Sequence, residues 1–201
     1  MSTIHDKYTT ACTRGSDINE HLPTLKRYTD MCTHVTECGV RGVVSSWAFA
    51  AGLLGKPGAR LVQVDLDTNS NVVMFGNLAR QNGIDTVFYK QSDLECPIEP
   101  TELLFIDTWH VYGHLKRELA RWNAHVSKYI IMHDTTVDEW RGETIRCGWN
   151  PVKQSAETGI PVDEIVKGLW PAIDEFLREH PEWTLEARYT NNNGLTILRR
   201  V

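Results

Sequence analysis

The stretch HVTECGVRGVVSSW, residues 34–47, decides the fold of this chain. It begins as a short apolar strand that ends on Glu37, turns on glycines, and enters a helix through two serines. Glycines allow a tight turn and let a ligand approach bare backbone, and the first turn of a helix has unpaired N–H groups. A second apolar strand, residues 60–65, also ends on a carboxylate, Asp65. Two acidic strand ends beside a glycine turn suit a nucleoside, whose ribose carries two hydroxyls.

The same alternation continues along the chain. Short apolar runs predict further strands, and spacing at three to four residues predicts a helix after most of them. We expect strands at 34–38, 60–65, 86–89, 102–107 and 128–132, and helices at 46–54, 69–81 and 113–126. Strands that are apolar throughout are buried on both faces, so the pattern predicts a parallel α/β sheet with helices on both sides. Helical spacing near 18–32 predicts an N-terminal helical segment (1–33) ahead of the main unit (34–201), the whole forming one domain.

The last third of the chain has a different pattern. Residues 135–160 are polar and rich in turn formers, which predicts a long excursion over one edge of the sheet. A helix is expected over 162–180, interrupted at Pro171. Two strand-like runs, 183–189 and 194–200, are joined by Asn-Asn-Asn-Gly, which predicts an antiparallel hairpin because Asn and Gly tolerate positive φ.

Composition narrows the class of protein. With 201 residues, 41% of them hydrophobic, the chain can bury the core of one soluble domain. A net charge of −5, with no basic run, argues against a nucleic-acid partner, and no apolar run approaches the ~20 residues of a membrane span. The N-terminus lacks the pattern of a signal peptide, and five cysteines without a CxxC motif indicate free thiols. We therefore expect a cytoplasmic enzyme or binding domain.

Three motifs at strand ends carry a family resemblance. They are ECGVRGVVS (37–45), IDTWHVY (106–112) and MHDT (132–135). In this order they resemble class I S-adenosylmethionine-dependent methyltransferases, within the branch of sugar and antibiotic O-methyltransferases grouped with cephalosporin-hydroxylase-like proteins. The compact length and motifs also resemble the rhamnose-methylating domain of chlorovirus glycan-building enzymes. The resemblance implies a Rossmann-like fold, with a mostly parallel seven-stranded sheet that ends in a C-terminal antiparallel hairpin.

The resemblance also implies contacts to the cofactor S-adenosylmethionine. The glycine turn would receive its methionine end, Asp65 its ribose hydroxyls and Asp93 its adenine amine. Arg41 and Val43 stand where the family usually has its second and third glycines, a departure that leaves the contacts at this turn open. Other interpretations are a serine N-cap at the turn, Asp67 as the capping residue of the next helix, and Asp93 as an ordinary loop residue. The expected cofactor-binding residues are Glu37, Gly39, Arg41, Ser45, Asp65, Asp93 and Asp107.

Acidic and histidine side chains gather at the ends of two later strands. In open α/β sheets the carboxyl ends of the strands border the ligand crevice. His110 suits a general base because its ordinary pKa lies near neutrality, although a histidine packed on the next helix is the alternative. The resemblance implies that Asp107, which also serves catalysis, holds a divalent cation, Mg²⁺ or Mn²⁺, together with Asp134 and His133; an imidazole ligand would favour Mn²⁺-like ions. His114, one turn after His110, is expected at the surface.

These features predict an S-adenosylmethionine-dependent O-methyltransferase that acts on a deoxysugar-like hydroxyl of a glycan or glycoside. Trp109, Tyr112 and Trp140 are candidates for an apolar wall against the sugar ring, with core packing as the alternative. The chain could also be one part of a larger multidomain glycan-building enzyme. Rival functions are a catechol-type metal-dependent methyltransferase and a non-catalytic module that binds the cofactor or a partner. A nicotinamide oxidoreductase fits less well, because the glycine spacing differs.

Overall fold

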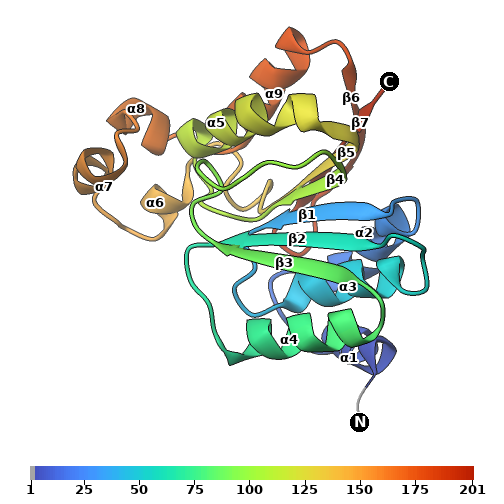
Figure 1. Cartoon of the computed structure of the whole chain (residues 1–201). Coiled ribbons are helices and arrows are strands. Elements are labelled where there is room, and N and C mark those ends of the chain that lie inside the picture. Colours follow the sequence, from blue (N-terminus) through green and yellow to red (C-terminus); the bar gives the residue numbers. More distant parts are fainter. Residues whose placement is uncertain (1–2) are drawn as a thin grey trace.

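The computed structural model describes residues 3–201, which contain one seven-stranded sheet in the order β3-β2-β1-β4-β5-β7-β6 (Figure 1). Strands β1 to β5 run parallel to one another, whereas β7 runs antiparallel to both β5 and β6. The strands are β1 (His34–Cys38), β2 (Arg60–Asp65), β3 (Asp85–Lys90), β4 (Thr101–Ile106), β5 (Val126–His133), β6 (Trp183–Tyr189) and β7 (Leu195–Arg200). The predicted parallel sheet with a terminal antiparallel hairpin is confirmed.

Helices cover both faces of this sheet, as predicted (Figure 1). On one face lie α1 (Ile4–Thr13), the 3₁₀ turn η1 (Asn19–His21), α2 (Leu22–Thr29), α3 (Val44–Leu53) and α4 (Ser70–Gln81). On the other face lie α5 (Tyr112–Trp122), followed by the 3₁₀ turn η2 (Asn123–His125), and α9 (Trp170–Glu179). Each face has its own apolar core, with Phe49 and Phe75 buried in the first and Trp122 and Phe176 in the second.

The excursion after β5 is more ordered than the sequence predicted. Residues 135–160 contain two short helices, α6 (Glu143–Arg146) and α7 (Pro151–Thr158), which lie beyond the sheet edge in Figure 1. The helix predicted over 162–180 is interrupted, but not at Pro171: α8 (Val162–Ile165) ends well before α9 (Trp170–Glu179) begins. Between them Gly168 packs so closely on the Asp138 carbonyl that an added Cβ would lie 2.3 Å from it. Pro171 stands in the first turn of α9, where its missing N–H costs nothing.

Strand order reverses next to β1, because β2 and β4 flank it on opposite sides. At such a switch point the loops after neighbouring strands diverge and leave a crevice at the carboxyl ends. At this point Gly39 allows the turn after β1 to pack closely against the segment after β4. It has φ +89°, and an added Cβ would lie 1.9 Å from the Asp107 carbonyl oxygen. The glycine turn after β1 and the acidic segment after β4 are therefore in direct contact.

Two findings concern membrane-spanning helices and the pairing of cysteines. Across residues 3–201, helices long and apolar enough to cross a membrane are absent. All five cysteines in this range are unpaired, and only Cys147 is exposed. Packing and hydrogen bonds, rather than disulfides, hold the described part of the fold together.

Candidate active site

One groove of about 880 Å³ runs along the carboxyl edge of the sheet. Gly39 and Asp65 line one end, and Trp149 and Ile160 from the excursion line the other. Its volume lies within the range of roughly 300–1,000 Å³ found for small-molecule sites. Acidic side chains predominate among its charged residues, which are Arg41, Asp65, Asp67, Asp93, Glu95, Asp107, Glu143 and Glu157. The groove therefore favours neutral or cationic ligands over polyanions.

Asp65 fixes the backbone of the glycine turn through hydrogen bonds. Its Oδ2 accepts hydrogen bonds from the backbone N–H groups of Val40 and Arg41, both at 2.8 Å. Its Oδ1 accepts one from the N–H of Asp67 at 3.0 Å. A carboxylate has about four acceptor positions, so after these three bonds about one remains on Asp65 for a ribose hydroxyl. Asn69, rather than Asp67, caps α4.

The departure from the family glycine pattern coincides with unusual backbone. Arg41 and Val43 have φ of +40° and +61°, the left-handed region that glycine adopts freely. For other residues this conformation costs roughly 1–2 kcal/mol, and it is rare for a β-branched residue such as valine. An ion pair of 2.7 Å between Arg41 and Asp17 and the burial of Val43 help hold the turn in this form. The turn thus keeps a glycine-like path although two of its residues carry side chains.

Glu37 is turned away from the groove. Its buried carboxylate accepts hydrogen bonds from Ser45 Oγ (2.5 Å), Ser46 Oγ (2.7 Å) and Gln63 Nε2 (2.8 Å). Burial raises the pKa of Glu37 to about 7, against the opposing effect of these three donors. The serines bind this carboxylate and do not cap α3, whose N-cap, Val43, makes no side-chain capping bond. The structure thus gives Glu37 and Ser45 a role in supporting the turn.

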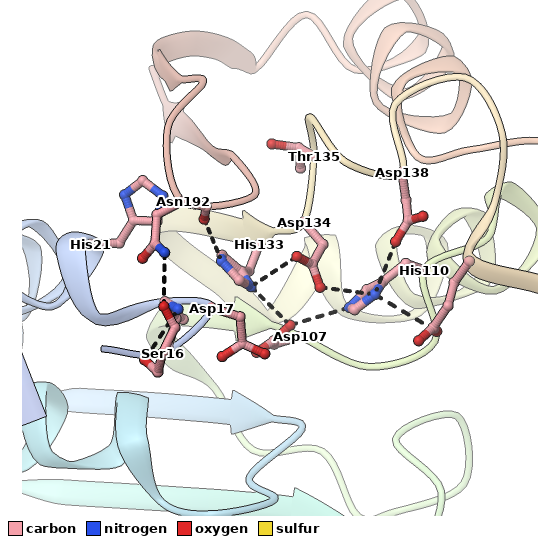
Figure 2. A network of polar contacts seen from close by, with 12 residues as sticks. Ser16, Asp17, His21, Asp107, His110, His133, Asp134, Thr135, Asp138 and Asn192 are labelled. Atoms are coloured by element: carbon pink, nitrogen blue, oxygen red, sulfur yellow. Dashed lines mark hydrogen bonds and ion pairs between the residues drawn. The ribbon is translucent and has the colours of Figure 1, made fainter. Parts of the chain in front are cut away.

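His110 stands among four carboxylates that come from three segments of the chain. We call these five residues the His110 cluster: His110, Asp107, Asp134, Asp138 and Glu143. Figure 2 shows His110 with Asp107, Asp134 and Asp138. The Nε2 of His110 lies 3.2 Å from Asp107, and its Nδ1 lies 3.0 Å from Asp134, 3.4 Å from Asp138 and 3.7 Å from Glu143. Burial alone would lower the pKa of His110, but these carboxylates outweigh it and raise the pKa well above its ordinary value. For Asp107, burial alone would raise the pKa, but hydrogen bonds and ion pairs with His110 and His133 lower it strongly.

Asp138 and Glu143 are members of this cluster that the sequence analysis missed. Asp138 is fully buried, and both its oxygens accept hydrogen bonds from the Arg146 guanidinium, at 2.7 and 2.8 Å. The backbone N–H of Glu143 donates to the His110 carbonyl at 2.9 Å. Both residues lie in the excursion, where no strand end indicated their position. The available signal was the spacing of Asp138 four residues after Asp134.

His133 lies behind Asp107 as seen from His110 (Figure 2). Its Nδ1 is 3.2 Å from Asp107 Oδ1, and its Nε2 is 3.2 Å from the Asn192 carbonyl oxygen. Burial opposes ionisation, but the Asp107 carboxylate outweighs it and raises the pKa of His133. Both ring nitrogens are thus engaged by neighbours. The three side chains that could share one ion at this edge are Asp107, His110 and Asp134.

The donor set at this edge fits a divalent cation. Asp134 has φ +57°, a strained conformation of the kind found at functional sites. Its buried Oδ1 has no hydrogen-bond partner among the described residues. Asp107 and Asp134 together offer the carboxylate oxygens that Mg²⁺ and Mn²⁺ prefer. Thr135, the next residue, is turned toward β7, where its hydroxyl accepts a hydrogen bond from Thr196 at 2.9 Å.

At the other end of the groove, tryptophans come from two segments. Trp109 and Trp149 line it, and the sequence analysis did not select Trp149. Tyr112 and Trp140, which were expected there, lie outside the groove lining. The Tyr112 hydroxyl instead donates to Glu175, and Trp140 is exposed. His114, expected at the surface, lines the groove beside the buried Asp93.

Comparison with known proteins rests on structure, because no family model matches the chain. A search of curated proteins found no match to its sequence either. An O-methyltransferase from Bacillus cereus, solved with S-adenosylhomocysteine, superposes with a TM-score of 0.63 at 13% identity, over 100% of this chain and 91% of its own. The O-methyltransferase TomG from Streptomyces achromogenes, involved in tomaymycin synthesis and solved with S-adenosylmethionine, gives 0.58 at 12% identity, over 98% and 90%.

A third structure broadens the comparison. The N-methyltransferase NodS from Bradyrhizobium japonicum gives a TM-score of 0.57 at 11% identity, covering 92% of this chain and 96% of its own. Likeness at this level of identity establishes the fold and leaves the acceptor atom open. The fold is that of the class I S-adenosylmethionine-dependent methyltransferases.

Proposed function

We propose that this chain, which has the class I methyltransferase fold, is an enzyme that transfers a methyl group from S-adenosylmethionine to a hydroxyl of a sugar or glycan. The observation that carries this proposal is that one groove joins the glycine turn after β1 to the His110 cluster. In the reaction the acceptor oxygen attacks the methyl carbon, the methyl–sulfur bond breaks, and S-adenosylhomocysteine leaves. The acceptor proton passes to a base of the protein.

The half of the groove near Gly39 is the proposed cofactor end. Asp65 would bind a ribose hydroxyl, and Asp93, in the loop after β3, lines the groove where the adenine is expected. Arg41 borders the same region. Superposition on structures solved with S-adenosylhomocysteine and S-adenosylmethionine supports this choice of cofactor.

The His110 cluster is the proposed place where the acceptor hydroxyl is activated. The methyl of a sulfonium is already reactive, so the protein mainly aligns oxygen, carbon and sulfur and removes a proton. His110 is the proposed base, and it must be in its neutral form to accept that proton. A divalent cation held by Asp107 and Asp134 would supply Lewis acidity, lowering the pKa of the acceptor hydroxyl. His133 would keep Asp107 oriented, as its 3.2 Å contact suggests.

A sugar is the proposed acceptor because of the residues at the far end of the groove. Trp109 and Trp149 offer flat apolar surfaces, and Glu143, Gln154 and Glu157 offer hydrogen-bonding groups. Apolar surfaces with a few well-placed polar groups are what a hydroxylated ring requires. The excess of carboxylates disfavours acceptors that carry phosphate. A catechol remains the second candidate, because two adjacent hydroxyls could approach the Asp107–Asp134 pair.

The first experiment is a calorimetric titration with S-adenosylhomocysteine, once with chelator and once with Mg²⁺ or Mn²⁺. We expect micromolar binding under both conditions, because a cation at Asp107 and Asp134 would act on the acceptor and not on the cofactor. Absence of binding under both would overturn the proposed function. Turnover assays with a deoxysugar glycoside and a catechol would then decide the acceptor class.

A further inference from the structure

A second cluster of possible metal ligands lies beside the groove, away from the His110 cluster. It comprises Asp93, from the loop after β3, with His114 and Glu118 from α5. His114 and Glu118 are four residues apart and therefore lie one above the other on the same face of the helix. One ligand atom from each residue can be chosen so that all three lie within 4.8 Å of one another.

The distances suit a small cation. His114 Nε2 lies 3.2 Å from Asp93 Oδ2 and 3.9 Å from Glu118 Oε1. Bond lengths of about 2.0–2.2 Å in a tetrahedral zinc site place neighbouring ligand atoms roughly 3.3–3.6 Å apart. The observed separations lie on either side of this range, so small side-chain movements would bring the three atoms to a common centre.

A buried polar atom without a partner is the second observation. Glu118 is 1% exposed, and its Oε2 has no hydrogen-bond partner among residues 3–201. Asp93, 7% exposed, is hydrogen-bonded to His114 Nε2 through Oδ1 at 3.3 Å, whereas its Oδ2, 3.2 Å from the same nitrogen, lacks the alignment of a hydrogen bond. An unsatisfied buried carboxylate oxygen is costly unless a proton or a cation occupies the space it faces.

The surroundings hold the three side chains in place. The Thr108 hydroxyl donates to Glu118 Oε1 at 2.8 Å, as neighbours of metal ligands commonly do. The Trp122 indole N–H donates to the Asp93 carbonyl oxygen at 3.3 Å, which fixes the loop. Asp93 and His114 also line the groove, which provides a path for an ion.

We propose that Asp93, His114 and Glu118 form a second metal site, for a zinc-class divalent ion, that ties the loop after β3 to α5. One imidazole nitrogen and two carboxylates favour Zn²⁺, Mn²⁺ or Co²⁺ over Mg²⁺. With neutral His114, the two carboxylates balance the charge of the ion. The site is structural and does not depend on methyl transfer, since it would brace the wall of the groove whatever reaction takes place there.

The test is a titration with Co²⁺ alone, followed by visible absorption, in a background that lacks the other cluster. Asp107→Asn/Asp134→Asn removes those ligands, and we expect this protein to bind one Co²⁺ with the intense spectrum of four-coordinate cobalt. Adding His114→Gln should weaken binding at least tenfold, whereas adding His5→Gln, an exposed histidine on α1, should leave it unchanged. Glu118→Gln is the second test variant, because its amide can still contact Thr108.

Thermal unfolding supplies an independent measurement. Zn²⁺ should raise the unfolding temperature of the Asp107→Asn/Asp134→Asn protein, because an ion that binds only the folded state stabilises it. The same addition should have little effect once Glu118 is replaced. A background protein that binds no cobalt would overturn the proposal and indicate that Asp93 and Glu118 share a proton instead. Cobalt binding that survives both His114→Gln and Glu118→Gln would overturn it equally.

Discussion

At the scale of single residues, Glu37 shows how burial alters a carboxylate. Its pKa is raised to about 7 by burial, whereas an unfolded glutamate titrates near 4.5. The folded protein therefore keeps a proton that the unfolded chain releases, and stability should fall as pH rises from about 4.5 to about 7. The expected loss is on the order of 3 kcal/mol. Glu37→Gln should abolish this part of the pH dependence, measured by urea unfolding at pH 5 and pH 8.

The matched control is Glu179→Gln at the exposed end of α9, which should follow the wild-type pH dependence. Parallel curves for wild type and Glu37→Gln would mean that the carboxylate is not held protonated in the fold. The network around it would then stabilise the charged form.

His110 is the residue whose replacement should affect chemistry most. A positioned base contributes roughly 10²–10⁴-fold to rate, so His110→Ala should lower kcat by that amount. S-adenosylhomocysteine affinity should change little, because His110 packs against Asp134 and Asp138, which are not part of the proposed cofactor end. In the wild type kcat should rise with pH through the raised pKa of His110, and the variant should lack that rise. Unchanged turnover would exclude His110 from proton transfer, with His125→Ala, in η2, as control.

At the scale of elements, the tip of the β6–β7 hairpin forms hydrogen bonds with the N-terminal segment and with the end of β5. The Asn192 side chain accepts from the Glu20 N–H at 3.0 Å and donates to the Ser16 carbonyl at 2.9 Å, while its own carbonyl lies 3.2 Å from His133 (Figure 2). A turn predicted only to reverse the chain thus also supports the residue behind Asp107. The hairpin connects the N-terminal segment to the active-site edge.

Two separate substitutions of Asn192 distinguish the effect of its side-chain hydrogen bonds from that of its backbone conformation. Asn192→Ala removes both side-chain bonds and places alanine at φ +44°, so we expect a loss of about 2–3 kcal/mol in the free energy of unfolding. Asn192→Gly removes the same bonds but tolerates that φ, and should lose about 1 kcal/mol less. Denaturant unfolding of the two variants measures the difference. Equal losses would show that the backbone conformation at the tip costs nothing.

At the scale of the whole molecule, α6 and α7 lie beyond the edge of the sheet (Figure 1). Residues of these two helices and of the loops beside them line the far end of the groove. We expect Trp149→Ala to lower kcat/KM for the acceptor about tenfold or more, because it removes an apolar wall of the groove. The affinity for S-adenosylhomocysteine should stay the same, as the cofactor end lies elsewhere. Trp140→Ala is the matched control, since Trp140 is exposed in the same excursion and outside the groove lining. Equal effects of the two substitutions would remove the acceptor role from Trp149.

Much of the architecture follows from local patterns. The alternation of strands and helices over residues 34–132, the terminal hairpin and the gathering of Asp107, His110, His133 and Asp134 at one edge were all predicted. The position of the break between α8 and α9 was not, because it depends on Gly168 packing against the distant Asp138 carbonyl. Nor was the inward orientation of Glu37, which depends on Gln63 from the neighbouring strand.

By itself the sequence determined which strands form, the helices between the first five of them, and which residues stand at the strand ends. Alternation, turn formers and apolar runs act between residues close in the chain, so they can be read without knowing the fold. Only the tertiary structure decided what each of these side chains meets. Asp138 and Glu143 contact His110 from the polar excursion after β5, and Asp93 contacts His114 from the loop after β3. Such contacts join distant segments, and packing of the whole molecule sets the direction of every side chain that makes them.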